Sequence, residues 1–278
     1  MGIESAMTLV LVRGGGDLAS GVALRLHRCR FQVIITELER PFAVRRRVSF
    51  AEAVYRGATR VEECTARRVA DPEDRLGVQR IIEEGDIPVL IDPEGTAIRN
   101  FLPAVVVDAR MLKQYPRYDQ AADRLVIGLG PGFVAGENCD AVVETNRGLS
   151  LGRVVWKGPA EPDTSVPETV GGHGEERVLR SPADGPVIAH AEIGDRLERG
   201  QLIAEVGGQP VRAAFKGRLR GLIFPGTRVE KHRKIGDLDP RGDWRACTQV
   251  SDKSLAVAGG VLEAILSRRS SGSDRKKP

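Results

Sequence analysis

A glycine-rich turn near the start of the chain constrains its fold more than any other feature. The apolar run Leu9–Val12 precedes this turn, residues 13–21 with the sequence RGGGDLASG, and a helical pattern follows it. Strand, glycine turn and helix in this order begin a dinucleotide-binding fold, and Gly14, Gly16 and Ala19 match its G-x-G-x-x-G/A spacing. Glycine suits such a turn because a phosphate approaches the backbone closely, and the helix N-terminus offers free N–H groups.

An acidic residue at the end of the next apolar run extends this candidate site. Glu37 follows the run 32–36 and lies 23 positions after Gly14, near the spacing of about 20 expected for a ribose-binding carboxylate. Asp17 can cap the helix, but its negative charge would repel a phosphate at the same place. Arg13 and the basic run 45–47 could offset this repulsion. Alternatively, the glycines only pack helix on strand and Glu37 is a solvated strand end. The candidate residues here are Gly14, Gly15, Gly16, Asp17, Ala19, Ser20 and Glu37.

Short apolar runs alternate with helical patterns along the first 150 residues. Runs at 65–69, 87–91, 104–108 and 125–128 are bounded by turn residues, whereas 42–55 and 72–84 have helical spacing. The alternation predicts a Rossmann-like, doubly wound parallel α/β domain over residues 1–150. A second glycine turn, 128–132, would then lie at the same carboxyl edge of the sheet. We therefore add Gly128, Gly130 and Gly132 to the candidate cofactor-binding residues.

An internal repeat predicts a second, all-β domain. Residues 185–204 and 217–236 match at a constant offset of 32, with glycines and apolar residues in register. Two interlocked halves of a small barrel sandwich would explain this, and the segment 178–245 resembles the biotinyl/lipoyl carrier fold, joined by a linker over 151–177. In that family the modified lysine lies on the hairpin between the halves. The hairpin here, 206–210, has no lysine, so we expect no biotin or lipoate attachment.

The end of the chain carries its net charge. Residues 246–267 are predicted to form a helix that packs on the α/β domain, and 268–278 a disordered basic tail. Residues 267–278 contain five Lys or Arg and one acid, which accounts for the formal net charge of +4. The rest of the chain therefore has no basic excess, and with no nucleic-acid module visible we expect no nucleic-acid partner.

Apolar runs and cysteines restrict the compartment and the metal chemistry. No apolar run is long enough for a transmembrane helix and no secretory signal is visible, so we expect a cytoplasmic protein without membrane contact. The four cysteines lack metal-site spacing and are expected to be reduced. Cys139, in a Gly/Pro-rich loop, is the candidate reactive thiol. Asp92 and Asp108 lie at strand ends on the predicted ligand-binding edge of the sheet. They could bind a metal, act as a base or be ordinary strand-end carboxylates, and we assign no metal.

Several motifs together resemble one protein family over the whole ordered chain. This is the family of bacterial and archaeal proteins named for selenium-dependent molybdenum hydroxylase systems, the YqeB type. The chain differs from the family pattern at 146–149, where Asn-Arg-Gly-Leu stands in place of Met-Arg-Gly-His. The matching motifs are RGGGDLASG at 13–21, ELERP at 37–41, AVRR at 43–46, FAEAVY at 50–55, GLGPGF at 128–133, ETNRG at 144–148 and KIGDLDPR at 234–241.

The resemblance implies an accessory role in maturing molybdenum hydroxylases. The bound cofactor would be molybdopterin or its cytosine dinucleotide, and the partner a molybdenum hydroxylase or its maturation machinery. Arg147 would then meet an anionic group of the ligand. Two alternatives remain, an NAD(P)-dependent oxidoreductase, for which no Tyr-x-x-x-Lys motif is present, and a non-catalytic scaffold that docks a partner enzyme. A homo-oligomer is compatible with the sequence, and no catalytic residue is assigned.

Overall fold

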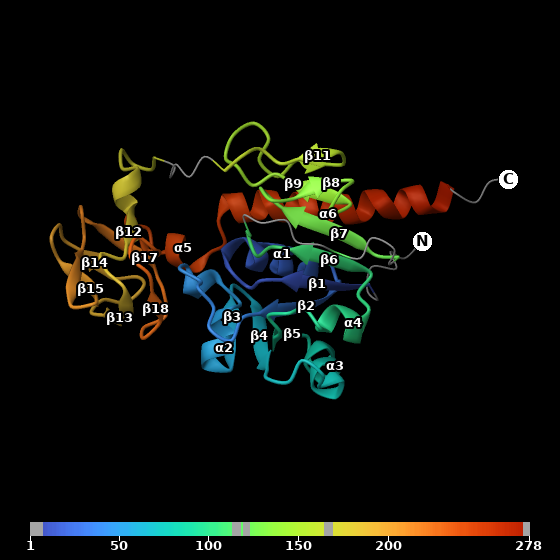
Figure 1. The fold of residues 1–278 in the computed structure, drawn as a ribbon, viewed down its shortest axis with the longest axis horizontal. Helices are drawn as coiled ribbons and strands as arrows, with labels where there is room; N and C mark the ends of the chain where they lie inside the picture. The colour runs from blue at the N-terminus through green and yellow to red at the C-terminus, as the bar shows by residue number, and fades with distance from the viewer. Residues whose placement is uncertain (1–7, 113–117, 119–122, 164–168, 275–278) are drawn as a thin grey trace.

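A large sheet forms the centre of one of the two lobes seen in Figure 1, the α/β domain; the other lobe is the β domain. The computed structural model describes residues 8–112, 118, 123–163 and 169–274. The strands of the large sheet are β1 (Leu9–Arg13), β2 (Gln32–Glu37), β3 (Ala58–Val61), β4 (Cys64–Val69), β5 (Ile87–Ile91), β6 (Val105–Asp108), β7 (Leu125–Leu129), β9 (Ala141–Val143) and β10 (Val154–Val155). Their spatial order is β10-β9-β7-β6-β1-β2-β5-β4-β3.

The α/β class is confirmed, but the sheet is mixed rather than wholly parallel. The neighbours from β4 to β9 pair in parallel, whereas the edge strands β3 and β10 pair antiparallel with β4 and β9. Only Glu62 and Glu63 separate β3 from β4, and so short a turn can join only antiparallel strands. After β5 the chain crosses to β6, on the other side of β1. The strand order therefore reverses between β1 and β6.

Helices cover both faces of the sheet. The apolar residues of α1 (Asp17–Arg28), α2 (Glu52–Arg56) and α6 (Asp252–Asp274) share one core with Val10 and Val12. Leu11 points to the opposite face and shares a core with α3 (Arg75–Glu83) and α4 (Ala97–Phe101), because side chains alternate along a strand. The helix predicted over 42–55 is reduced to a short 3₁₀ turn, η2 (Arg46–Val48), and α2.

The C-terminal helix α6 runs along the α/β domain and packs on α1 (Figure 1). The contact is close, because a Cβ added to Gly21 would lie 2.7 Å from the Cβ of Ser254. The helix continues past Ser267 to Asp274, into the segment predicted as a disordered tail, since a helix fixed by packing propagates readily. Residues 275–278 of that predicted tail lie outside the described residues. Among the described residues, no helix has the length and apolar character needed to cross a membrane.

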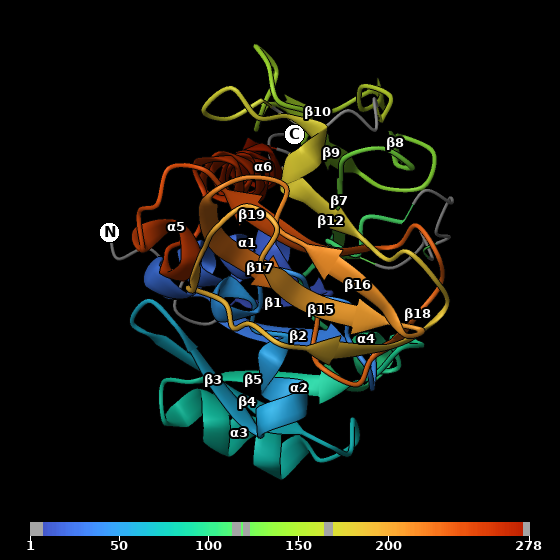
Figure 2. The same cartoon turned by 90° about the vertical axis from the view of Figure 1, so that its left-hand side faces the viewer.

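The β domain consists of two four-stranded sheets, β12-β19-β17-β14 and β16-β15-β13-β18. Strands β13, β14 and β15 begin at 185, 196 and 202, and β17, β18 and β19 begin at 217, 228 and 234, so the offset of 32 recurs in the structure. Strand β14 pairs with β17 and β18 pairs with β13, so the two copies interlock (Figure 2). The strands are β12 (Val178–Arg180), β13 (Gly185–Ala189), β14 (Arg196–Leu197), β15 (Leu202–Val206), β16 (Gln209–Arg212), β17 (Gly217–Leu222), β18 (Arg228–Val229) and β19 (Lys234–Asp239).

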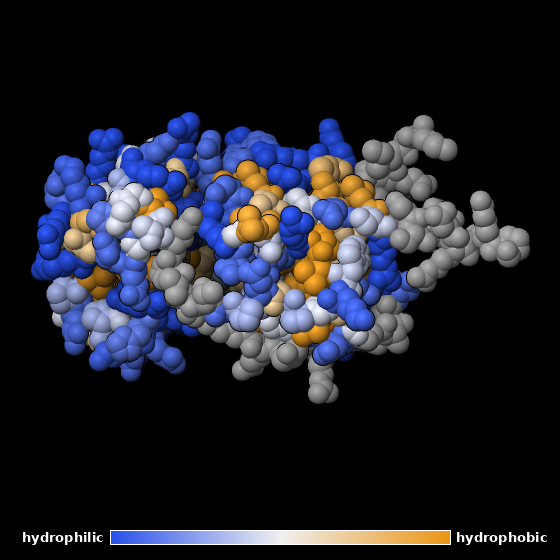
Figure 3. Space-filling model, turned by 90° about the horizontal axis from the view of Figure 1, so that it is seen from above, coloured by the Kyte–Doolittle hydropathy of each residue, from blue (hydrophilic) through white to orange (hydrophobic). Residues whose placement is uncertain are grey.

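The segment between the two lobes is partly built into the α/β domain. Strand β10 extends the large sheet, and β11 (Gly158–Pro159) pairs with β8 (Val134–Ala135), so the first part of the predicted linker contributes strands. The 3₁₀ turn η3 (Glu175–Arg177) leads into the β domain, and α5 (Arg245–Thr248) leads out of it. From above, hydrophobic residues gather mainly over the α/β domain, whereas the β domain is largely hydrophilic (Figure 3).

Candidate functional site

A cavity of about 530 Å³ opens beside the first glycine turn. Its walls come from the carboxyl ends of β1, β2, β5 and β6 and from the N-terminus of α1, and Arg233 of the β domain lines it as well. The cavity therefore lies where the strand order reverses between β1 and β6. This is the place at which open α/β sheets bind ligands.

The three consecutive glycines of this turn have different surroundings. Gly14 has a φ of +92°, which favours glycine, and a Cβ there would lie 3.3 Å from the carbonyl oxygen of Ala109. A Cβ on Gly15 would lie 2.8 Å from the backbone nitrogen of Ala51. Gly16 has a φ of −71°, which any residue adopts, and a Cβ there would have no heavy atom within 4 Å. Packing thus explains the first two glycines and leaves Gly16, which lines the cavity, unexplained.

The N-terminus of α1 keeps free hydrogen-bond donors. The N–H of Gly14 donates to the carbonyl oxygen of Thr36 at 2.8 Å, and that of Gly15 to Oε2 of Glu37 at 3.4 Å. Within the described residues, no hydrogen bond engages the N–H of Gly16, Asp17 or Leu18, and no side chain caps the helix. All three of these residues line the cavity, so the helix offers it open donors and a partial positive charge.

The carboxylate of Asp17 is neutralised. Its two oxygens accept hydrogen bonds from Nη1 of Arg45 at 2.6 Å and from the hydroxyl of Ser254 at 2.8 Å. Of the basic run 45–47, only Arg45 therefore offsets the charge of Asp17, as expected from the sequence. Arg46 instead pairs with Glu52. Asp17 thus ties α1 to the start of α6, and the Arg45 guanidinium offsets its negative charge beside the cavity.

Arg13 is a buried cation in the cavity wall. It is 7% exposed, and its Nη2 donates to the carbonyl oxygen of Pro93 at 2.8 Å. Its Nε is buried without a hydrogen-bond partner, and no carboxylate among the described residues pairs with it. A Cβ on Gly95 would lie 2.8 Å from its Cζ, so the guanidinium packs against that backbone. Because an unpaired buried charge is costly, such an arginine is suited to a bound anion.

Glu37 ends β2 and accepts a hydrogen bond from the N–H of Gly15 in the glycine turn. Burial raises the pKa of its carboxyl above the ordinary value of 4.5, and hydrogen bonds from the backbone N–H groups of Leu38 and Gly15 oppose that rise only in part. The raised pKa favours the neutral form.

Other predicted residues at this edge have structural partners. The hydroxyl of Ser20 donates to the carbonyl oxygen of Gly15 and accepts from the N–H of Phe50, and Ala19 is buried in the core. Asp92 accepts from the backbone N–H groups that begin α4, whereas Asp108 pairs with Arg110. Among the described residues, no group of three or more His, Cys, Asp or Glu could hold a metal ion.

The second glycine turn does not reach the cavity. A Cβ on Gly128 would overlap the ring of Phe133, and one on Gly130, where φ is +70°, would overlap the hydroxyl of Thr145. Gly132 also has a positive φ, +98°. None of these three glycines lines the cavity. Packing and backbone conformation therefore account for this turn.

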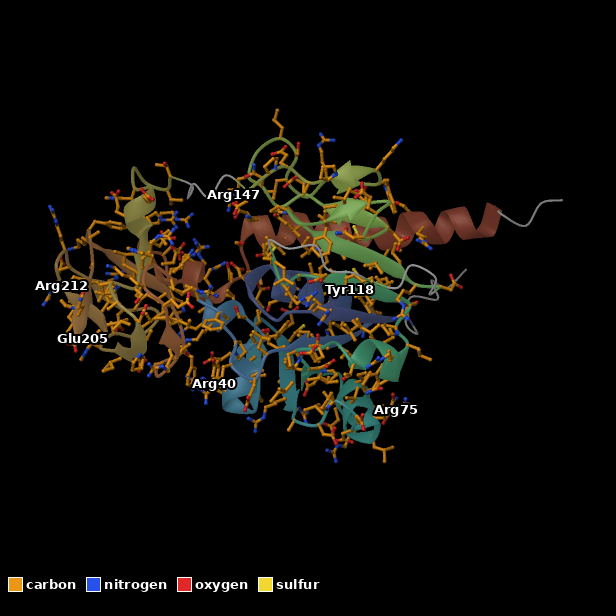
Figure 4. The ribbon with its side chains drawn as sticks, viewed as in Figure 1. Arg40, Arg75, Tyr118, Arg147, Glu205 and Arg212 are labelled. Atoms are coloured by element: carbon orange, nitrogen blue, oxygen red, sulfur yellow. The ribbon has the colours of Figure 1, made fainter. Side chains whose placement is uncertain are left out.

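Two further candidates also lie outside the cavity. Arg147 forms a two-bond ion pair with Asp252, at 2.9 and 2.8 Å, and Figure 4 places it near the start of α6, away from Tyr118. The Cys139 thiol is buried, and burial raises its pKa to about 12. A thiol with such a pKa stays protonated and is a poor nucleophile at neutral pH.

A larger groove, of about 1250 Å³, separates the β domain from α2 and β3. Its four arginines already have partners. Arg46 and Arg56 both pair with Glu52, Arg47 lies over the Trp244 ring, and Arg60 donates to the carbonyl oxygen of Glu62. We therefore place the candidate ligand site in the smaller cavity, where Arg13 and the α1 N-terminus are available.

Sequence reasoning missed the residues at the mouth of this cavity. Leu38, Phe42 and Arg233 line it, and Arg233 comes from the β domain, more than 210 residues after the glycine turn. Phe42 begins a segment with helical spacing, and this spacing does not indicate that its side chain is exposed. The pattern of apolar residues along a short stretch of sequence does not indicate which residues will contact another domain.

The chain is similar to a known protein over most of its length. No family model matches. Over 264 residues the chain is 44% identical to the uncharacterized protein YqeB of Escherichia coli K12, a match that covers 94% of this chain and 48% of that protein. The chain therefore spans about half the length of the curated relative that it matches. This identity supports the resemblance to YqeB-type proteins.

Similarity to solved structures is weak. An aspartoacylase family protein from Mesorhizobium loti has 8% identity and a TM-score of 0.24, with 84% of each chain covered. A succinylglutamatedesuccinylase/aspartoacylase from Rhodobacter sphaeroides has 8% identity and a TM-score of 0.25, with 83% of this chain and 85% of that chain covered. Scores this low support no argument about fold or activity.

Proposed function

We propose that the protein binds a phosphate-bearing cofactor at the α1 N-terminus and serves as an accessory protein in the maturation of molybdenum hydroxylases, selenium-dependent ones included. The proposed ligand is molybdopterin or its cytosine dinucleotide. Its phosphate oxygens would accept hydrogen bonds from the N–H groups of Gly16, Asp17 and Leu18. Glu37 would contact a sugar hydroxyl of the dinucleotide.

The observation that carries the proposal is that Gly16 and Arg13 line the same cavity. Gly16 leaves a space that a side chain would enter, next to open N–H groups. Arg13 is a buried guanidinium without a carboxylate partner among the described residues. An oxyanion bound between them would use the free donors and would neutralise the buried charge. A purely architectural turn needs neither feature.

The proposed link to molybdenum hydroxylases rests on the resemblance to YqeB-type proteins, which the 44% identity supports. In this proposal the β domain has a biotinyl/lipoyl-like arrangement and docks the partner enzyme. The interlocked pairing of its two repeat copies supports that arrangement. The proposal includes no attached biotin or lipoate, because the β15–β16 hairpin is formed by Gly207 and Gly208 without a lysine.

One observation also favours an NAD(P)-dependent oxidoreductase. Glu37 ends β2 beside the glycine turn, where a carboxylate in dinucleotide-binding folds contacts the adenosine ribose. Binding of a nicotinamide dinucleotide without binding of molybdopterin compounds would favour this alternative. A screen for hydride transfer would then follow.

Calorimetric titration of the purified full chain tests the proposal. The ligands are molybdopterin, its cytosine dinucleotide, NAD⁺ and NADP⁺, and the variant is Gly16→Asp. An aspartate at this N-cap position accepts from the free N–H groups and places a negative charge in the anion site. We expect the cytosine dinucleotide to bind wild type and its affinity to fall about 100-fold or more in the variant.

The matched control is Gly259→Ala in α6, where an added Cβ would meet only Nη1 of Arg25 at 3.5 Å. This change is expected to leave ligand affinity unaltered and to stabilise the helix by about 1 kcal/mol. If folded wild-type protein binds none of the four ligands, the cofactor proposal is wrong. Equal affinities of wild type and Gly16→Asp would place the ligand elsewhere.

A further inference from the structure

The mouth of the cavity has a different chemistry from its base. Arg13, Glu37 and the α1 N–H groups make the base polar. At the mouth, four large hydrophobic side chains line the cavity although each is well exposed. They are Leu38 (43% exposed), Phe42 (42%), Met111 (39%) and Leu112 (38%). Exposed apolar side chains gathered around one opening mark a surface that another molecule covers.

The β domain contributes a cation to this mouth. Arg233, in the loop between β18 and β19, holds its Cζ 4.8 Å from the centroid of the Phe42 ring. Within the described residues it forms no ion pair, and it lines the cavity. A guanidinium and an aromatic ring in this arrangement are both flat and both stack on planar groups.

We propose that the mouth binds a planar heterocycle whose attached phosphate lies at the base of the cavity. The ligand class is a phosphate ester of a ring compound, a nucleotide or a phosphorylated pterin. In the bound state, Phe42 stacks on one face of the ligand ring. Arg233, which lies over the Phe42 ring in the structure, moves away from that ring and covers the other face of the ligand ring. This inference rests on the proposed phosphate site, and it makes the β domain part of the binding site.

The chemistry of the mouth favours a ring over an aliphatic chain. Leu38 and Leu112 would contact either ligand, because apolar burial is not directional. The Phe42–Arg233 pair is selective, since ring–ring stacking and cation–π attraction both need a planar partner. A phosphate without a ring would therefore use the base of the cavity and gain nothing from the mouth.

Titration of three probes separates the two ends of the cavity. Inorganic pyrophosphate probes the base alone, and cytidine diphosphate and 6-hydroxymethylpterin diphosphate add the two kinds of ring to the same diphosphate. We expect at least one ring-bearing probe to bind wild type about tenfold tighter than pyrophosphate. Phe42→Ala and Arg233→Ala should each remove most of that gain, lowering affinity for the ring probe about fivefold and leaving pyrophosphate affinity unchanged.

Two kinds of control keep the result specific. Phe42→Tyr preserves the ring face and should retain the gain, whereas Leu149→Ala, which removes an apolar side chain that is 98% exposed elsewhere, should change nothing. Arg228→Ala removes another exposed arginine of the β domain, outside the cavity lining, and should also be silent. Which ring gives the larger gain distinguishes a nucleotide from a pterin.

Failure of this inference differs from failure of the phosphate site. Equal affinities for pyrophosphate and both ring probes, or a gain that survives Phe42→Ala and Arg233→Ala, overturns the inference and leaves the phosphate site in place. Absence of binding by all three probes, including pyrophosphate, overturns the proposed function and the inference with it.

Discussion

The two glycine-rich turns of the α/β domain end strands of the same sheet, at the same edge, but they have opposite surroundings. After β7, the side chains of Phe133 and Thr145 occupy the space that a Cβ on Gly128 or Gly130 would need. After β1, Gly16 borders open space and the N–H groups of the following helix lack partners among the described residues. Glycine thus permits close packing in one turn and leaves room for a ligand in the other.

The amino-acid sequence of the turns alone cannot distinguish these two uses of glycine. Both turns follow a buried strand, and both contain glycines at alternate positions. The distinction comes from what lies next to the turn, the Phe133 ring against Gly128 in one case and a cavity beside Gly16 in the other. Variants that add a single atom or group at each turn are therefore the sharpest way to test the comparison.

The largest effect is expected in the filled turn. Gly128→Ala would force a Cβ into the Phe133 ring, and overpacking of this kind should lower the free energy of unfolding by about 3 kcal/mol. Gly16→Ala should lower it by less than about 1 kcal/mol, because only the N-cap preference changes. Urea unfolding of both variants measures the difference. Similar losses at the two positions would break the comparison.

Removal of the buried charge of Arg13 should lower the affinity for the ligand more than it lowers the free energy of unfolding. Arg13→Met keeps the bulk of the side chain but removes its charge, so pyrophosphate affinity should fall about 10- to 100-fold. The free energy of unfolding should stay the same or rise by about 1 kcal/mol, since the variant loses a buried charge that no carboxylate among the described residues pairs with. Arg147→Ala, which removes an arginine paired with Asp252, is the control and should not alter binding. A large stability loss in Arg13→Met would mean that the guanidinium is structural.

A serine at position 16 should change stability and binding in opposite directions. Its hydroxyl can accept from a free N–H of α1, as N-cap serines do, and should raise the free energy of unfolding by about 0.5 kcal/mol. The same hydroxyl competes with the ligand for that donor, so pyrophosphate affinity should fall about tenfold. Thermal unfolding and titration of Gly16→Ser measure the two effects. A variant that is stabilised and binds normally would show that the open donors are not used by the ligand.

The smallest expected effect concerns pH. Burial raises the pKa of Glu37 above 4.5 in the folded protein, so the folded state binds its proton more tightly than the unfolded chain. Stability conferred by this group is therefore lost as pH rises from about 4.5 through the folded pKa. Glu37→Gln should gain stability relative to wild type over that range, as denaturant unfolding at several pH values would show. A constant difference between the two proteins would contradict the raised pKa.

The elements around the first turn could be predicted because their signals are local. The apolar run 9–12, the glycines and the acid at Glu37 each follow from short-range rules of strand, turn and helix. The repeat offset of 32 likewise recurs in the strands of the β domain. Residues 42–55 show the limit of such rules. Arg45 there donates to the carbonyl oxygens of Ala246 and Gln249, and such tertiary contacts override helical spacing.

The rest of the candidate site depends on contacts that the sequence does not encode locally. Arg13 could be named as a cation near the turn, but its burial, and the lack of a carboxylate partner for it among the described residues, follow from the packing of β1 against its neighbours. Arg233 reaches the cavity only because the β domain packs beside it. Arg147 had the right charge, but it lies beside the start of α6, where it pairs with Asp252.

A two-dimensional amide NMR titration with inorganic pyrophosphate tests the central claim most directly. The account predicts saturable shifts of the N–H signals of Gly16, Asp17 and Leu18, while the signals of Gly128 and Gly130 stay in place. Absence of saturable shifts at residues 16–18, or shifts of similar size at both turns, would contradict it.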